Sequence, residues 1–345
     1  MSPRPSLYLI DGNSQMYRAY HAQIRTGEGT LLRNSGGIPT NAVFIFVNML
    51  RKLIKEQEPA YIAASFDLPG RTFRDDLAAD YKANRAPMPP DLAGQIPLVH
   101  QACEALGVPI ITYEGYEADD IIATAVRRSG EPDAVADGPM EVEIVTGDRD
   151  SYQLVQDPHI KVVYNKRGVS DYALYDEAGI LERTGVHPTQ YVQYAALRGD
   201  PSDNLPGVPG VGEKTAAKLI NSYGGLDGIF EHVDEQTPKL RQNLAEHEQQ
   251  ARRNVEMMTL LRDVVPGRLL HQQVLRQKQA SLSQLRLRGH SLTLTEGWPL
   301  YVAPLVMELF PKGTASQRLQ LLIHKHRLVQ LGRLIVALRL HVSGS

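Results

Sequence analysis

The stretch GDPSDNLPGVPGVGEKTAAK, from Gly199 to Lys218, contains two candidate binding features next to each other. Its first half carries two carboxylates, Asp200 and Asp203, with Pro201 directly after the first. Because Asp is a good N-cap and Pro is well tolerated in a first helical turn, one turn would bring both acids to the same side. The first half is therefore a candidate metal-binding segment.

The second half, GVPGVGEKTA, predicts a glycine-rich hairpin that runs into a helix. Exposed N–H groups at a helix start bind anions, and glycine lets a phosphate come close. A nucleotide-binding P-loop also has glycines before Lys-Thr, but here Glu213 separates Gly212 from Lys214 and no apolar strand precedes the loop. A plain corner between two helices, with glycine caps, stays open from these residues alone.

The residues before this stretch predict an α/β domain. Short apolar runs indicate buried strands, and apolar positions at helical spacing alternate with them. This alternation predicts a doubly wound, mostly parallel sheet over about residues 1–185, followed by a helical region from 186 to about 265. The strands are expected at 6–10, 60–66, 109–112, 140–146 and 160–164, and the clearest helices at 42–55, 97–106, 190–197, 215–222 and 238–261.

Acidic residues gather where the expected strands end. Asp11 and Asp67 follow the first two strands, and Asp148 and Asp150 follow the fourth. An Asp-Gly turn is a common alternative for Asp11 alone. The carboxyl ends of parallel strands share one edge of the sheet, where such folds bind ligands.

A further acidic cluster, GYEADDIIATAV, places Glu117, Asp119 and Asp120 in the first turn of an expected helix. The helix dipole favours one or two acids there, but three in four positions repel one another and indicate a cation site. A lone Mg²⁺ needs only one or two carboxylates, so the whole set implies two or more ions, an arrangement that promotes phosphoryl displacement.

Between residues 70 and 90 cations alternate with aromatic rings. Arg71, Arg74, Lys82 and Arg85 are interleaved with Phe73 and Tyr81, which suits phosphates and a stacked base. Asp75, Asp76 and Asp80 also fit an exposed, solvated loop in which they act as counter-charges, and these residues alone favour that alternative.

The composition is that of a globular protein, with 345 residues of which 42% are hydrophobic and 22% charged. The single cysteine, Cys103, excludes an internal disulfide and a cysteine-rich zinc site. We expect no secretory signal and no membrane span, because no uncharged apolar run approaches the roughly 18 residues that a span needs. A cytoplasmic location fits these observations.

Charge divides the chain in two. From Gly267 on there are eleven Lys/Arg and only two acids, so this tail carries about +9 and the body before it about −11. An acidic body does not favour wrapping of DNA unless metal ions neutralise part of it. The tail, 266–345, is either a basic arm that adds nonspecific DNA affinity or sequence not evolved as a domain, such as translation past a frameshift, which we favour.

Five segments together resemble the 5′-nuclease (flap endonuclease-like) superfamily, and most closely the 5′→3′ exonuclease domain of bacterial DNA polymerase I. The resemblance extends over about residues 6–260 and depends on the order and spacing of the segments. They are LIDGNSQMYRAYHA, ASFDLPGRTFRDDLAADYKANRAPMP, GYEADDIIATA, VTGDRDSYQLV and LRGDPSDNLPGVPGVGEKTAAKLI.

The resemblance implies a PIN-like (Rossmann-like) catalytic domain at 1–185, with an arch or clamp at about 70–95, and a helix–three-turn–helix (SAM-like) DNA-binding domain at 186–265. Nine acids fall on the metal-site positions: Asp11, Asp67, Glu117, Asp119, Asp120, Asp148, Asp150, Asp200 and Asp203. Tyr81, Lys82 and Arg85 fall on the helical arch, where the two cations would stabilise the scissile phosphate and Tyr81 would stack on the terminal base. This overturns the solvated-loop interpretation. DNA-binding positions are Arg25, Arg71, Arg74, Gly207, Gly210, Gly212, Lys214, Thr215 and Lys218.

The implied activity is a structure-dependent 5′→3′ exonuclease or flap endonuclease that hydrolyses DNA phosphodiesters with two or more Mg²⁺ ions, for which Mn²⁺ can substitute. A K⁺ ion held by hairpin carbonyls is part of the same resemblance. The expected partners are DNA with 5′ flaps, nicks or 5′ ends, and RNA–DNA hybrids, in replication (Okazaki-fragment primer removal) and repair. A monomer in the bacterial cytoplasm, at the nucleoid, is expected. The alternatives are a PIN-like ribonuclease, which would lack the GVPGVGEKT hairpin, and a DNA-binding relative without catalysis. Because no polymerase domain follows, we expect a stand-alone nuclease or a fragment.

Overall fold

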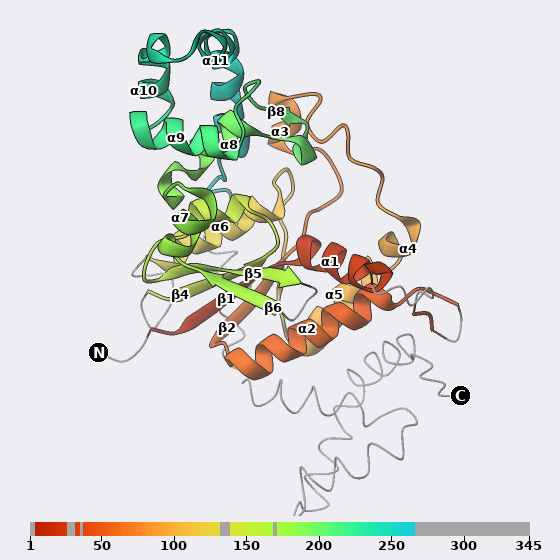
Figure 1. Ribbon diagram of the computed structural model, residues 1–345. Helices are drawn as coiled ribbons and strands as arrows, with labels where there is room; N and C mark the ends of the chain where they lie inside the picture. The colour runs from red at the N-terminus through yellow and green to blue at the C-terminus, as the bar shows by residue number, and fades with distance from the viewer. Residues whose placement is uncertain (1–3, 26–31, 35–36, 132–138, 168–170, 266–345) are drawn as a thin grey trace, which may run out of the picture.

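The computed structural model describes residues 4–25, 32–34, 37–131, 139–167 and 171–265 (Figure 1). The tail at 266–345 lies outside these residues, so both interpretations of it stay predictions. Among the described helices, none has the length and apolar character that crossing a membrane requires.

A six-stranded sheet forms the centre of the N-terminal part, in the order β3-β2-β1-β4-β5-β6. The first five strands run parallel, and β6 is antiparallel at the edge. All five strands expected from the sequence are present, whereas the edge strand β6 was not expected. The bounds are β1 Ser6–Asp11, β2 Tyr61–Ser65, β3 Ile110–Ile111, β4 Glu141–Thr146, β5 Ile160–Arg167 and β6 Asp171–Tyr175.

Each face of the sheet is covered by helices (Figure 1). Side chains alternate along β1, so that Tyr8 and Ile10 join the core with α1, α2 and α5, while Leu7 and Leu9 join the core with α6. This confirms the predicted doubly wound α/β arrangement. The helices of this part are α1 Gly12–Arg25, α2 Asn41–Gln57, α3 Phe73–Leu77, α4 Pro90–Ala93, α5 Ile96–Leu106, α6 Ala118–Ser129 and α7 Glu177–Thr184.

The C-terminal part of the described chain is helical. Helices α8 Tyr191–Arg198, α9 Glu213–Tyr223, α10 Leu226–Glu231 and α11 Pro238–Met258 lie together at one end of the sheet (Figure 1). The predicted helices at 190–197, 215–222 and 238–261 correspond to α8, α9 and α11. The two-residue strands β7 Gly199–Asp200 and β8 Leu205–Pro206 pair between α8 and α9, and they enclose the short 3₁₀ turn Pro201–Asp203.

After α11 the chain returns to the first part of the molecule. The Leu261 N–H donates to Asp120 at the start of α6 (2.9 Å), and the Leu260 N–H donates to Gln153 (3.0 Å). Val264 N–H reaches the Thr124 hydroxyl of α6 at 3.2 Å. Buried polar groups with good partners fix geometry, so these bonds hold the helical part against α6.

The segment at 70–95, which the resemblance assigns to an arch or clamp, contains little helix. Only α3 and α4 are helical there, and Lys82, in the turns between them, has φ +55°. Pro87, Pro89 and Pro90 lack N–H donors and restrict the residues before them, which prevents a continuous helix. The segment instead docks on the 3₁₀ turn, where the Lys82 N–H donates to the Asp203 carbonyl at 3.0 Å.

Candidate active site

Strand register brings Asp11 beside the end of β4. Ile10 pairs with Val145, so Asp11 lies next to Thr146, whose hydroxyl donates to Oδ2 of Asp11 at 2.6 Å. Oδ1 accepts the Ser14 N–H at 2.9 Å. Asp11 is only 4% exposed, and burial, reinforced by the charge of Asp148, raises its pKa to about 7 despite these hydrogen bonds. Asp11 therefore lies at the sheet edge where the sequence predicted that the acids gather.

Asp119, in the first turn of α6, faces the same group of acids. Its Oδ1 is buried and has no hydrogen-bond partner in the described structure. Burial raises the pKa of Asp119 well above its ordinary value, and the charges of Asp11, Asp148, Asp67 and Asp150 raise it further. A buried carboxylate oxygen without a donor is unfavourable, so this side chain is suited to a bound cation.

Asp148 and Asp150 follow β4 directly. The Asp150 N–H donates to Oδ1 of Asp148 at 2.9 Å, and Asp150 begins a 3₁₀ turn, Asp150–Leu154. Burial raises the pKa of both carboxyls, and the charges of Asp200 and Asp203 raise both further. The pairs Asp148/Asp150 and Asp200/Asp203 therefore influence each other although about fifty residues of sequence separate them.

A solvent-open pocket of about 380 Å³ lies between the sheet edge and the helical part. Its acidic lining comes from both parts of the chain and is only partly neutralised by three cations. The acids are Glu117, Asp119, Asp148, Asp150, Asp200 and Asp203, and the cations are Arg74, Lys82 and Arg85. Six of the nine predicted metal-site acids thus share one pocket.

The donor set fits hard divalent cations, which prefer carboxylate oxygens. The pocket has six acids and three cations, so its own groups leave negative charge unneutralised, and the Oδ1 of Asp119 has no hydrogen-bond partner among the described residues. Within the described residues, however, no three His, Cys, Asp or Glu side chains lie close enough together to form a finished metal site. The acids surround the pocket instead of forming a tight cluster.

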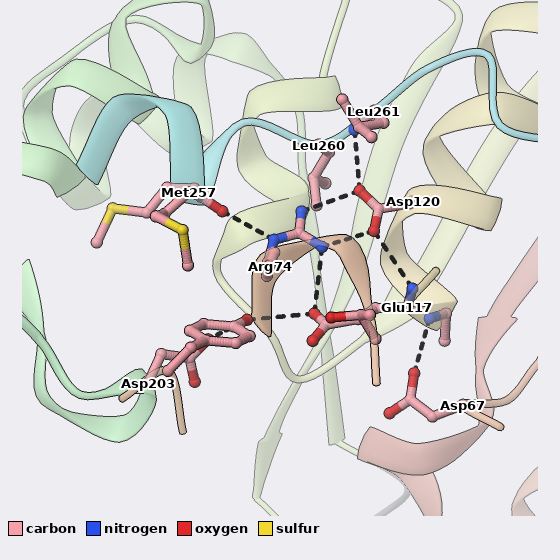
Figure 2. A network of polar contacts seen from close by, with 12 residues as sticks. Asp67, Arg74, Glu117, Asp120, Asp203, Met257, Leu260 and Leu261 are labelled. Carbon is pink, nitrogen blue, oxygen red and sulfur yellow. Dashed lines mark hydrogen bonds and ion pairs between the residues drawn. The ribbon is translucent and has the colours of Figure 1, made fainter. Parts of the chain in front are cut away.

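Asp67 and Asp120 are placed differently from the pocket acids. Asp67 caps the start of α6 by accepting the Ala118 N–H at 2.7 Å, and it also accepts from the Asn13 side chain. Asp120 is fully buried and forms a two-bond ion pair with Arg74, at 2.6 and 2.9 Å (Figure 2). Its carboxylate also accepts the Leu261 N–H, so Asp120 is bound to protein groups and does not line the pocket.

Arg74 differs from the expectation that it contacts DNA. It is 2% exposed, and besides Asp120 it donates to the carbonyl of Met257 at 2.8 Å and to Glu117 at 3.4 Å (Figure 2). Burial alone would lower the pKa of Arg74, but its hydrogen bonds to Asp120 and the charges of Asp120 and Glu117 raise it. The guanidinium therefore connects α3 to the start of α6 and the end of α11, because acids and backbone carbonyls there accept its hydrogen bonds.

Lys82 and Arg85 reach the pocket as expected, where they are paired with its acids. The Lys82 ammonium lies 2.7 Å from Glu117, and Arg85 forms an ion pair with Asp203. Tyr81 is 7% exposed, and its hydroxyl lies 3.0 Å from Asp203 and 3.3 Å from Glu117. A ring this buried is not available to stack on a base, which corrects the role expected for Tyr81; its hydroxyl orients two acids instead.

The glycine-rich hairpin adjoins the pocket through the pair β7–β8. A Cβ at Gly207 would lie 2.2 Å from the Arg198 carbonyl, so only glycine allows this backbone crossing. Gly210 has φ +79°, and the carbonyl of Pro209 accepts from the Asn243 side chain at 2.6 Å. The predicted hairpin and helix are both present.

The remaining DNA-binding candidates differ in exposure. Gly210, Gly212, Lys214 and Lys218 are exposed around the hairpin and α9, and Thr215 is half-buried. Arg71 is exposed and pairs with Asp76 at 3.0 Å. The Arg25 side chain lies outside the described residues, so its role stays a prediction.

Two arginines beside the predicted acids were not singled out from the sequence. Arg149 lies between Asp148 and Asp150, and Arg198 precedes Gly199-Asp200. Both contact Glu213 at the start of α9, at 3.0 and 3.5 Å. Their position next to predicted site residues was a signal that could have identified them.

Two family models match consecutive parts of the chain. The 5′-3′ exonuclease N-terminal resolvase-like domain matches residues 6–185, and the 5′-3′ exonuclease C-terminal SAM fold matches residues 186–281. The second match begins where the sequence predicted the helical domain, and it extends beyond the described residues.

The curated relatives are bacterial DNA polymerases I. The chain is 43% identical to that of Mycobacterium leprae over 261 residues, or 76% of this chain and 27% of the relative. It is 37% identical to that of Bacillus subtilis over 264 residues, or 76% of this chain and 28% of the relative. The chain therefore spans somewhat more than a quarter of the length that these relatives have.

Solved structures share the fold at low sequence identity. The zinc-bound 5′-exonuclease of bacteriophage T5 matches with a TM-score of 0.61 and 22% identity, over 74% of this chain and 90% of that chain. A complex of the T5 flap endonuclease with DNA and metal ions matches with a TM-score of 0.59 and 21% identity, over 81% and 98% of the two chains. The family models over residues 6–281 and the shared fold show that this chain belongs to the 5′-3′ exonuclease family.

Proposed function

We propose that this chain hydrolyses DNA phosphodiesters at 5′ ends, nicks and 5′ flaps, with two or more divalent metal ions. The observation that carries this proposal is the continuity of the segment 199–212. Its first residues, Asp200 and Asp203, line the acidic pocket, and the hairpin with Gly207, Gly210 and Gly212 follows after a two-residue strand. A duplex bound at the hairpin would thus present its 5′ end to the pocket.

The pocket acids Glu117, Asp119, Asp148, Asp150, Asp200 and Asp203 would hold the ions, with Asp11 directly behind them. We expect Mg²⁺, with Mn²⁺ as a substitute, because the donors are all carboxylate oxygens. Bound ions supply Lewis acidity, which activates water and neutralises charge on the leaving oxygen. We retain Asp67 and Asp120 as metal-site predictions that act through neighbouring groups, since their own oxygens accept protein hydrogen bonds.

The cations at the pocket would stabilise the scissile phosphate. Lys82 and Arg85 are within reach of the pocket but are paired with Glu117 and Asp203, so a phosphate must replace these partners. Tyr81 donates to one acid at a time and would orient it for the ion. The chain's own residues therefore bind the phosphate and position the metal ligands.

The proposed partners are DNA flaps and nicks, and the RNA–DNA hybrids left by primers in replication and repair. The protein would act as a monomer at the bacterial nucleoid, in the cytoplasm. A K⁺ ion at the hairpin carbonyls is part of this proposal, although the carbonyls of Pro206, Gly207 and Pro209 already accept from Gln250 and Asn243. To test for this K⁺ ion, duplex binding is measured in K⁺ and in Na⁺ at equal ionic strength, and tighter binding in K⁺ is expected.

A substrate panel tests the proposed function. End-labelled flapped, nicked and single-stranded DNA and single-stranded RNA of the same sequence are incubated with Mg²⁺ or with EDTA. We expect Mg²⁺-dependent cleavage of the flapped and nicked DNA, and loss of cleavage with retained DNA binding for Asp119→Ala and Asp148→Ala. Preferred cleavage of the single-stranded RNA would support a PIN-like ribonuclease, and binding without cleavage a non-catalytic relative.

A further inference from the structure

Glu213 bridges two arginines that come from different parts of the chain. Its Oε1 lies 3.0 Å from Arg149 and 3.5 Å from Arg198. One carboxylate between two guanidinium groups leaves this cluster with a net charge of +1. We call these three residues the Arg149–Arg198–Glu213 cluster.

The cluster lies between the pocket and the hairpin. Arg149 is flanked by the pocket acids Asp148 and Asp150, and Arg198 is two residues before the pocket acid Asp200. Glu213 is the first residue of α9, directly after the hairpin. A strand of DNA that passes from the hairpin to the pocket would therefore run close to this cluster.

The Arg198 guanidinium is held in place by groups other than Glu213, whereas the Arg149 side chain is 42% exposed and is held through its ion pair with Glu213. Arg198 donates to the Gly199 carbonyl at 3.1 Å, lies 5.6 Å from the centre of the Tyr194 ring, and its side chain is only 18% exposed. Arg149 has its backbone fixed where the 3₁₀ turn Asp150–Leu154 begins. Preorganised guanidinium groups lose little entropy when they bind a phosphate, and their donor geometry matches its oxygens.

The Glu213 carboxylate is easily displaced. Its side chain is 59% exposed, and exposed ion pairs contribute little to stability and exchange readily. A DNA phosphate carries the same charge and offers oxygen acceptors to the same donors. In the free protein Glu213 thus occupies the position that suits a phosphate.

We propose that Arg149 and Arg198 form a phosphate-binding site for the DNA strand between the hairpin and the pocket, and that Glu213 competes with the phosphate for this site. This inference rests on the proposed function, because it takes DNA as the ligand. It assigns Glu213 a role in weakening and tuning duplex affinity.

The test measures binding of a 5′-flapped duplex to the full chain in EDTA, by fluorescence anisotropy over a range of KCl concentrations. Arg149→Gln and Arg198→Gln should each raise Kd by about 3- to 10-fold and lower the slope of log K against log salt by about 1. Glu213→Gln should lower Kd by about 3- to 10-fold, since the competing charge is gone.

Matched controls come from Arg252, an exposed arginine between two acids. It pairs with Asp227 and Glu248 at 2.7 and 2.9 Å, on α10 and α11. Arg252→Gln and Glu248→Gln change the net charge as the test variants do, and should leave Kd within about 2-fold of the wild-type value. Thermal unfolding checks that each variant is folded. If Arg198→Gln does not fold, the Kd values of Arg149→Gln and Glu213→Gln decide whether the phosphate site exists.

The outcomes separate this site from the proposed function. If the wild-type chain binds and cleaves the flapped duplex but Arg149→Gln and Glu213→Gln bind like their controls, the phosphate site is wrong and the nuclease proposal stands. If the wild-type chain neither binds nor cleaves the duplex, both proposals fail. Opposite shifts in Kd for Arg149→Gln and Glu213→Gln, absent from the controls, establish the site.

Discussion

The Lys82 ammonium lies 2.7 Å from the Glu117 carboxylate, so a lysine of the segment 70–95 binds a carboxylate oxygen that could otherwise bind a metal ion. Lys82 holds this position with a φ of +55°, which is costly for a residue with a side chain. The ion pair therefore replaces part of the charge neutralisation that divalent ions would provide.

Removal of the Lys82 charge should strengthen metal binding while it weakens catalysis. In Lys82→Met, Glu117 loses its partner, so we expect the Kd for Mn²⁺, measured by calorimetry without DNA, to fall by roughly 3- to 10-fold. Cleavage of a flapped duplex should fall by about 10²-fold, because the phosphate loses a cation. Lys82→Arg is the control, and a Kd for Mn²⁺ equal in both variants would contradict the competition.

Stability of the metal-free chain should depend on pH through the buried acids. The pKa of Asp11 is raised to about 7, so the folded state binds protons more tightly than the unfolded chain, and stability is lost as pH rises from about 4 to about 7. Each unit of raised pKa corresponds to about 1.4 kcal/mol. Urea unfolding in EDTA at pH 5.5 and 7.5 measures this loss. Added Mg²⁺ should remove most of it, whereas an equal loss with and without Mg²⁺ would show that the ions do not bind these acids.

Disruption of the buried pair Arg74–Asp120 should destabilise the fold. Arg74→Met leaves the Asp120 charge without its partner, and the expected loss is about 3–5 kcal/mol in the free energy of unfolding. Asp120→Asn in the same chain should recover part of that loss, since the uncompensated charge is gone. Arg128→Met breaks a half-exposed pair with Asp263 and should cost less than about 1 kcal/mol. A loss this small for Arg74→Met would mean that the pair is not structural.

Substitution by alanine should have different effects on stability and duplex binding at two hairpin glycines, Gly207 and Gly212. At Gly207 a Cβ would collide with the Arg198 carbonyl, so Gly207→Ala should lower the thermal unfolding midpoint by several degrees. At Gly212 a Cβ meets nothing within 4 Å, so Gly212→Ala should keep that midpoint but weaken duplex binding if a phosphate approaches there. Equal affinity of Gly212→Ala and wild type would remove Gly212 from the proposed interface.

The sequence predicted the sheet and most of its acids because both depend on local patterns. Apolar runs of strand length identified β1 to β5, and acids after the first, second and fourth runs identified Asp11, Asp67 and Asp148. The antiparallel β6 was missed because it is an edge strand: of its residues 172–175 only Ala173 is buried, so it lacks the buried apolar run of the inner strands.

Partner choice among charged residues could not be predicted in the same way. Arg74 is buried against Asp120 because α11 and the chain after it cover this region. Met257, which accepts from Arg74, is 183 residues away, so the local sequence around Arg74 could not predict this contact. Tyr81 was likewise expected to face DNA, and only the tertiary structure shows that the ring is buried.

The return of the chain after α11 also determines which fragments can fold. Met257 to Leu261 supply carbonyl and amide partners to Arg74, Asp120 and Gln153, all of which belong to the N-terminal part. A fragment ending at residue 185 would keep the Arg74–Asp120 pair and the whole sheet, but it would lose the backbone partners that Met257 to Leu261 supply. We therefore expect the autonomous folding unit to extend at least to Val264, so that the boundary between the two family models would not be a boundary of independent stability.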